Sequence, residues 1–547
     1  MKKKILGGFV IVLLIVFGVG VPILEDKVSD QLQNKLGSNF YYDFEDLTIS
    51  LWERELKLTN LSFAYPKDSS KFEYVGTANS FSVRGFDIIS LLFSQSLELG
   101  SISLESPTLT THISKKDNLN ESSDSLKLED LNFYSFIEGA LDELQLEKFI
   151  TTNGKFDWFY GTSDSLWRSI DGINLAINHF RLDSSIAADN NGWFKLDDVS
   201  LTVNHYTERL PDSIHSISSD SITLSYSKKL IDVKNLTMKP IYSRRELSRI
   251  LTYQKDILTM DVSRLSMREI DVDRLIYQEE LFVGEAMVKG LNLEVFKDKS
   301  LHFPHVYKEL PIKMLMNMEF SLTVNKVIIE DADVSYVQQS KQGENTGEVA
   351  FNQINASIYN LTSSEKQLEI NDHTKLEADA LLHGKGQIDL TVDFDLLDTT
   401  GGHQVKGSVT SFNLSDLNKI IVPLTYIKIE EGFGHGLYFN FYANNYGTKG
   451  DIKFIYNNLS LKLLDKTAYQ IGREEDRWLG SVLLNGFVVR KENPMGNLLR
   501  MGNIESDRNT EKSMFNLWWQ GIASGMSSTM INFKKDSKEV DVSETRK

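Results

Sequence analysis

Few residues in this chain have the types and spacing that metal binding or catalysis requires. His302 and His305 could share a metal ion if a helix presented both rings on one face. Pro304 stands between them and opposes a helix, because proline lacks an amide hydrogen. Asp393 and Asp395 alternate with apolar residues, which places both carboxylates on the solvent-exposed face of a strand. We interpret them as solvating groups rather than as a general acid and base.

Other chemical motifs are equally sparse. Gly432, Gly434 and Gly436 surround His435 but do not fit the Gly-x-Gly-x-x-Gly phosphate-binding pattern, and we predict a β-turn there. The sequence contains no P-loop, no Gly-x-Ser-x-Gly, no His-Glu-x-x-His and no EF-hand loop. It contains no cysteine, which excludes disulfides, thiolate zinc sites and thiol nucleophiles. We therefore expect no catalytic residues, no metal and no cofactor, in a protein that is not an enzyme.

Composition narrows the possible partners. The 547 residues include 41% hydrophobic and 25% charged residues, which is typical of a folded protein. A formal net charge of -17 repels phosphate backbones, so nucleic acid is not expected as a partner. At this length the chain forms either several domains or one elongated body.

The N-terminus has the pattern of a membrane anchor. An uncharged, mostly aliphatic run spans residues 5–24, long enough to cross a hydrocarbon layer about 30 Å thick. Lys2, Lys3 and Lys4 precede it and favour a cytoplasmic N-terminus, so we expect a single-pass bacterial inner-membrane protein with its bulk in the periplasm. A cleaved signal peptide is the alternative, although no small-x-small cleavage site follows the run. The predicted anchor residues are Ile5, Val10, Leu13, Leu14, Val16, Phe17 and Leu24.

From residue 40 onward apolar residues recur with a period of two, which predicts β-strands. In residues 388–396 every second residue is apolar and most of the intervening residues are acidic. Such one-sided alternation favours antiparallel strands with one solvated face. We expect a mostly β fold, an elongated and curled antiparallel sheet (a β-groove) with a few short helices. Candidate residues lining the apolar side are Leu97, Leu99, Leu104, Phe320, Leu322, Val324, Ile388, Leu390, Val392, Phe394, Leu437, Phe439 and Phe441.

A short phrase, Asn-Leu-Ser/Thr, recurs along the chain at Asn60, Asn235, Asn360, Asn413 and Asn458. We interpret it as punctuation between strands, a weak internal repeat, in preference to the N-glycosylation pattern that it also matches. Within several stretches the apolar parity slips by one residue, which predicts β-bulges. Bulges increase the twist that a long sheet needs in order to curl.

Helices are expected at only a few places. Residues 86–93, 136–144 and 243–252 have short helical patterns, residues 115–130 and 338–348 resemble polar loops, and the tail 532–547 is expected to fray. Residues 514–531 carry apolar side chains at helical spacing. This helix either caps the β body or contacts a membrane surface, as its adjacent tryptophans suggest. Its candidate contact residues are Phe515, Trp518, Trp519, Ile522 and Met526.

Several segments together resemble the AsmA-like and TamB-like proteins. They are FEDLTISLWERELKLTNLSF, then DIISLLFSQSLELGSISLESPTLTTHIS with Leu104, Pro107 and Leu109 in a Leu-x-x-Pro-x-Leu phrase, then FSLTVNKVIIEDADVSYVQQ and the region from GQIDLTVDFDLL to NLSLKLL, and finally RNTEKSMFNLWWQGIASGM. The resemblance implies an inner-membrane-anchored periplasmic β-groove that conducts phospholipid or supports outer-membrane assembly. It implies no catalytic residues.

The expected organisation is an anchor at 1–24, the two parts of a groove at 25–242 and 243–512, an amphipathic helix at 513–531 and a flexible tail at 532–547. We expect the apolar face to bind or conduct phospholipid acyl chains and so to support outer-membrane lipid homeostasis in the cell envelope. The alternative is an envelope-biogenesis scaffold or regulator, with a closed β core and envelope-protein partners. Burial of the apolar face is required in both cases, at about 25 cal/mol per Å².

Overall fold

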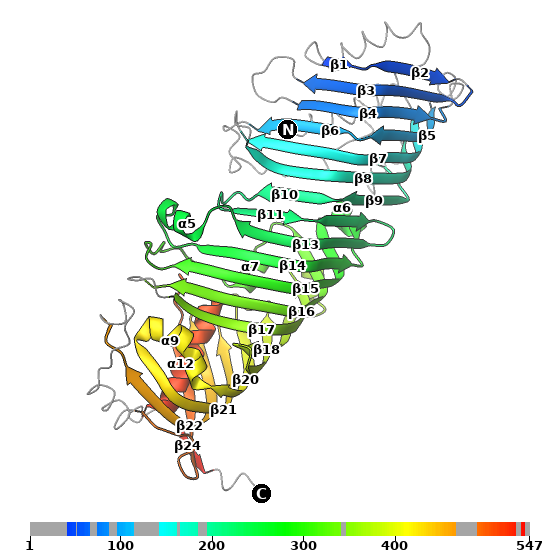
Figure 1. Ribbon diagram of the computed structural model, residues 1–547. Coiled ribbons are helices and arrows are strands. Elements are labelled where there is room, and N and C mark those ends of the chain that lie inside the picture. The colour runs from blue at the N-terminus through cyan, green and yellow to red at the C-terminus, as the bar shows by residue number, and fades with distance from the viewer. Residues whose placement is uncertain are drawn as a thin grey trace. The chain divides into compact units, whose positions relative to one another are not determined.

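The computed structural model describes residues 41–50, 52–65, 74–86, 96–113, 142–160, 165–183, 194–340, 346–466, 489–531 and 538–541. The chain forms two compact units, Met1–Leu236 with Arg268–Gln278, and Thr237–Met267 with Glu279–Lys547. Both consist mainly of strands with few short helices, which confirms the predicted mostly β fold (Figure 1). The predicted anchor lies outside the described residues. Within the described ranges, no helix is both long and apolar enough to cross a membrane.

The strands of the first unit form a mixed sheet. Most neighbours pair antiparallel, but β5 and β6 both pair in parallel with β7, so the expectation of a purely antiparallel sheet was wrong there. A parallel pair needs a long crossover, and residues 114–142 provide that length. The strands are β1 Tyr41–Asp43, β2 Asp46–Ser50, β3 Glu55–Tyr65, β4 Tyr74–Arg84, β5 Ser96–Glu105, β6 Thr108–Ile113, β7 Glu143–Tyr160, β8 Leu166–Asp183, β9 Asp198–Val203, β10 His205–Arg209, β11 His215–Ser219, β12 Ser221–Ser225 and β13 Leu230–Pro240, with helix α6 at Val272–Gln278.

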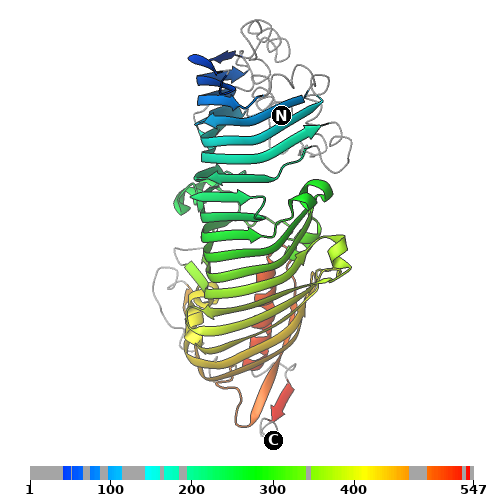
Figure 2. The same ribbon diagram turned by 90° about the vertical axis from the view of Figure 1, so that its right-hand side faces the viewer.

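The second unit has longer strands. β15 and β16 pair in parallel across a connection that contains α7, and β16–β24 pair antiparallel in succession. The strands are β14 Asp256–Arg268, β15 Glu280–Asp298, β16 Ser321–Gln339, β17 Thr346–Thr362, β18 His373–Leu382, β19 Gly386–Asp395, β20 His403–Asn413, β21 Ile427–Ala443, β22 Gly447–Leu463, β23 Leu498–Asp507 and β24 Lys538–Asp541. The helices are α5 Arg244–Ile250, α7 Pro311–Met316, α8 Glu365–Leu368, η3 Leu414–Leu417, α9 Asn418–Thr425 and α12 Met514–Met530. Figure 2 shows β17–β22 curving around α12.

Local predictions had mixed outcomes. The helix expected at 243–252 is α5, capped by the Ser243 hydroxyl and a capping box with Glu246. The helix expected at 136–144 is wrong at its end, because β7 already begins at Glu143, and the loop expected at 338–348 is shortened by β16 and β17. The frayed tail contains β24. Where the structure differs from these predictions, pairing with a neighbouring strand overrides the local sequence pattern. The expected helix at 87–93 and loop at 115–130 lie outside the described residues.

Four of the five recurring asparagines adopt a left-handed backbone conformation. Asn60, Asn235, Asn360 and Asn458 lie inside β3, β13, β17 and β22 with φ of 48°, 50°, 56° and 54°. Asn413 differs, because it precedes η3 with φ of -75°. The interpretation as punctuation between strands was therefore wrong for these four positions. The bulge predicted where the apolar parity slips after Tyr456 is confirmed, because the β21–β22 register shifts around Asn458. Asparagine fits because its short polar side chain tolerates the left-handed region better than most residues do.

Bulges on neighbouring strands line up. In the first unit Asn153 and Gly172 lie where the β7–β8 register shifts, with φ of 51° and 65°, and Ser106, between β5 and β6, has φ of 47°. The Asn153 amide donates to Oδ1 of Asn174 at 3.0 Å. In the second unit the same conformation occurs at residues 290, 331 and 353, where the β16–β17 register also shifts. Because each bulge bends its strand, an aligned series bends the sheet along one line. This is how these sheets curl.

Candidate functional site

Apolar ladders cross the strands of the first unit on one face of its sheet. Paired strands place the members directly opposite one another, and apart from Thr151 every member is apolar. One row runs from β2 to β13 through Leu47, Leu58, Phe81, Leu104, Thr151, Leu175, Leu201, Leu224 and Ile231. A second row on the same face runs from β2 to β9 through Ile49, Leu56, Val83, Ile102, Phe149, Ile177 and Val199.

The second unit has its own ladders. One row runs from β15 to β23 through Val288, Ile329, Ala356, Ala378, Leu390, Gly407, Phe439, Ile452 and Gly502. Another runs from β15 to β22 through Ala286, Val327, Ile358, Leu376, Val392, Val405, Phe441 and Gly450. We call the side of each unit's sheet that carries these rows its apolar face.

Exposure varies along the rows. Leu58 and Phe81 are only 4% and 1% exposed, whereas the members on β8–β13 are mostly partly exposed. In the second unit Ile452 is 1% exposed, whereas Val288 and Ile329 are partly exposed. A ligand could therefore contact the partly exposed apolar side chains on β8–β13 of the first unit and on β15–β19 of the second, but not buried members such as Phe81, Val392 and Ile452.

The opposite face of the second unit is polar and its charges are paired. Lys375 Nζ lies 2.6 Å from Oε1 of Glu377, and the Asn355 side chain donates to Asp379 at 3.0 Å. Asp393 is exposed and lies 2.7 Å from Nδ1 of His373, whose pKa its hydrogen bond raises. These contacts support solvation of an outer face as the role of the acids.

The helix α12 covers the apolar face at β22 and β23. Gly521 and Gly525 are buried and allow close approach, since a Cβ on Gly525 would lie 2.7 Å from Ile452 and Ile504. Trp518 Nε1 donates to Nε2 of buried His403 at 2.8 Å. Of the two sequence alternatives, the structure places this helix as a cap on the sheet.

The remaining predicted contact residues of α12 are placed less uniformly. Phe515 is 47% exposed and meets Phe351 edge to face, Trp519 is partly exposed, and Ile522 and Met526 pack against the buried cluster that includes Leu517. Two serines of the same helix bind the unpaired edge of β23. The hydroxyls of residues 524 and 528 accept hydrogen bonds from the backbone amides of residues 505 and 503. The helix therefore closes both a face and an edge.

The predicted lining residues divide into three groups. The buried members are Leu97, Leu99, Val324, Val392, Leu437, Phe439 and Phe441. The partly exposed members are Leu104, Leu322, Ile388, Leu390 and Phe394. Phe320 is 44% exposed and precedes β16, so it does not lie on a strand. The accessible members on β9 and β12, such as Leu201 and Leu224, were missed because their strands are too short for alternation to be distinctive.

The sites rejected from sequence are placed as follows. His305 Nδ1 lies 3.1 Å from Glu511 Oε1, and the backbone of His302 forms an isolated β-bridge with that of Tyr253. Among the residues that the structure describes, no group of three or more His, Cys, Asp or Glu could hold a metal ion. Gly432 lies inside β21 rather than in a turn, so the β-turn prediction was wrong. The glycine is needed there because its φ is 146° and Leu414 packs against it.

No protein-family model matches the chain, and no curated protein matches it.

Proposed function

We propose that this protein binds or conducts phospholipid acyl chains along its apolar face, as an inner-membrane-anchored periplasmic protein that supports outer-membrane lipid homeostasis. The resemblance to AsmA-like proteins and the lysine-flanked apolar run support the location. The observation that carries the proposal is that the apolar rows continue from strand to strand and that most of their members on β8–β13 and β15–β19 remain partly exposed. Each methylene group that leaves water on such a surface contributes about 0.8 kcal/mol.

A closed scaffold or regulator is the second candidate, and one observation favours it. At the C-terminal end of the second unit the apolar face is covered by α12, and residues such as Val392, Phe441 and Ile452 are at most 1% exposed. Lipid therefore has no access at this end while α12 is in place. The proposal concerns only the partly exposed strands.

A charged substitution on each face of one strand tests the proposal. Ile329 points to the apolar face and its neighbour Ile328 to the polar face, and both are partly exposed. We expect Ile329→Asp to reduce phospholipid transfer between vesicles and lipid co-purification, while Ile328→Asp retains both. Both variants should fold, because neither side chain is fully buried.

Two results would contradict a lipid-binding face. One is that Ile329→Asp unfolds the protein while Ile328→Asp does not, which indicates a sealed core. The other is equal lipid transfer and equal bound lipid in the two variants and the parent chain.

A further inference from the structure

Arg490 is a buried arginine with a fixed orientation. Its side chain is 4% exposed, its Nε donates to the Glu492 carbonyl at 3.0 Å and its Nη2 to the Leu498 carbonyl at 2.8 Å. Two backbone acceptors thus hold the guanidinium plane in place, and Nη1 is left to reach Glu539 at 3.1 Å. A donor that is already oriented loses little entropy when it binds an anion.

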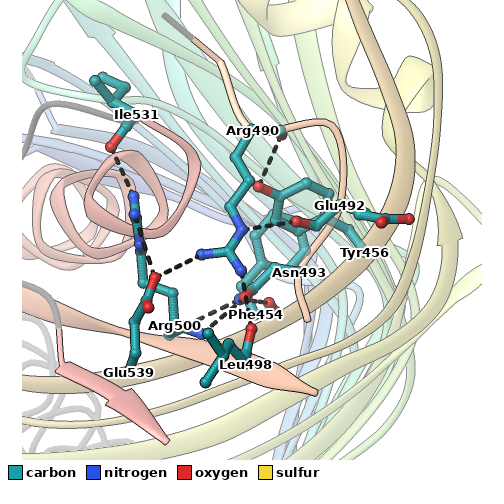
Figure 3. Close-up of polar contacts among 9 residues, drawn as sticks. All are labelled: Phe454, Tyr456, Arg490, Glu492, Asn493, Leu498, Arg500, Ile531 and Glu539. Atoms are coloured by element: carbon teal, nitrogen blue, oxygen red, sulfur yellow. Dashed lines mark hydrogen bonds and ion pairs between the residues drawn. The ribbon is translucent and has the colours of Figure 1, made fainter. Parts of the chain in front are cut away.

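Arg500 meets the same carboxylate from β23. Its Nη2 lies 3.4 Å from Oε1 of Glu539 and its Nη1 donates to the Ile531 carbonyl at 3.0 Å. Figure 3 shows both guanidinium groups turned toward Glu539. The Nε of Arg500 is buried and has no acceptor in the structure. One carboxylate oxygen therefore serves two cations, and one donor is unused.

The strand that supplies Glu539 is held weakly. All residues of β24 are exposed, and it pairs with β23 only from Leu498 to Met501. Val540, its apolar residue, is 42% exposed. With little apolar burial, polar contacts that include those of Glu539, together with the short ladder to β23, retain the strand.

We propose that Arg490 and Arg500 form a phosphate-binding site, and that Glu539 occupies it as an exchangeable internal carboxylate. Inorganic phosphate or a phosphomonoester such as phosphatidic acid offers at least three non-bridging oxygens, so it could pair with both guanidinium groups and with Arg500 Nε, whereas Glu539 supplies one oxygen to two arginines. The source is a phospholipid headgroup or free phosphate. The headgroup assignment rests on the proposed lipid function, but the anion site does not.

Calorimetric titration of the full chain in detergent tests the site, with inorganic phosphate, glycerophosphate and short-chain phosphatidic acid as separate probes. Glu539→Gln removes the competing charge and should tighten phosphate binding by about tenfold or more, the factor that corresponds to roughly 1.4 kcal/mol. Glu492→Gln is the matched control, because Glu492 is a neighbouring exposed carboxylate whose backbone alone contacts Arg490. It should leave binding unchanged.

A double variant, Glu539→Gln with Arg500→Lys, should lose most of the gain while retaining the charge, because lysine cannot reproduce the guanidinium fork. Tighter binding of phosphatidic acid than of inorganic phosphate identifies a lipid headgroup, and equal binding identifies free phosphate. Phosphate binding without lipid transfer would overturn the proposed function but not the site. Absence of binding in Glu539→Gln, or the same affinity in Glu539→Gln and Glu492→Gln, would show that the arginines only anchor the tail.

Discussion

Replacing Gly525 by alanine tests whether α12 packs on the sheet. An alanine Cβ would lie 2.7 Å from both Ile452 Cγ2 and Ile504 Cγ1, and these isoleucines are 1% and 0% exposed. Overpacking a buried site costs about 1–3 kcal/mol, and so short a contact between fixed groups favours the upper half of that range. Alanine also raises helix propensity by about 1 kcal/mol relative to glycine. The net expectation is a destabilisation of about 1–2 kcal/mol.

The sign of the change decides between the two placements of this helix. If α12 left the sheet and lay on a membrane surface, only the propensity term would remain, and Gly525→Ala would stabilise the helix by about 1 kcal/mol. Urea unfolding of the full chain in detergent, followed by tryptophan fluorescence, measures the difference. Ala523→Gly calibrates the propensity term at a partly exposed position of the same helix. A rise in stability for Gly525→Ala, equal and opposite to the loss for Ala523→Gly, would refute the packing.

Two further predictions concern pH and one of the left-handed asparagines. Burial, and to a smaller extent the charge of Arg508, lower the pKa of His403 below its ordinary 6.5. The unfolded chain therefore binds more protons than the folded chain, and the free energy of unfolding should fall as pH drops below that value. His403→Gln should flatten this dependence in unfolding experiments above and below pH 6.5, and an unchanged slope would contradict it. Asn235→Val should be about 1–2 kcal/mol less stable than Asn235→Gly, because both lose the hydrogen bond to Asp220 but only valine resists a φ of 50°. Equal stability of the two variants would show that the backbone relaxes at this position.

The candidate site was only partly predictable. Alternation in residues 388–396 correctly identified one side of β19 as apolar, because period two is a property of any extended chain. It did not distinguish Leu390, which is partly exposed, from Val392, which is 0% exposed, because that difference depends on how closely other elements pack over each residue. The arginine site carried no sequence signal, since Glu539, which contacts both Arg490 and Arg500, lies far from them in the chain.

The sequence by itself determined that the body is mostly β, that one face of its strands is apolar, and that residues 514–531 form an amphipathic helix. These follow from local periodicity, which needs no partner. Only the tertiary structure decided that β15 and β16 pair in parallel, that four of the recurring asparagines adopt a left-handed backbone, and that α12 covers the face. Strand order, left-handed backbone and helix docking each depend on contacts between residues distant in the chain, which no local pattern encodes.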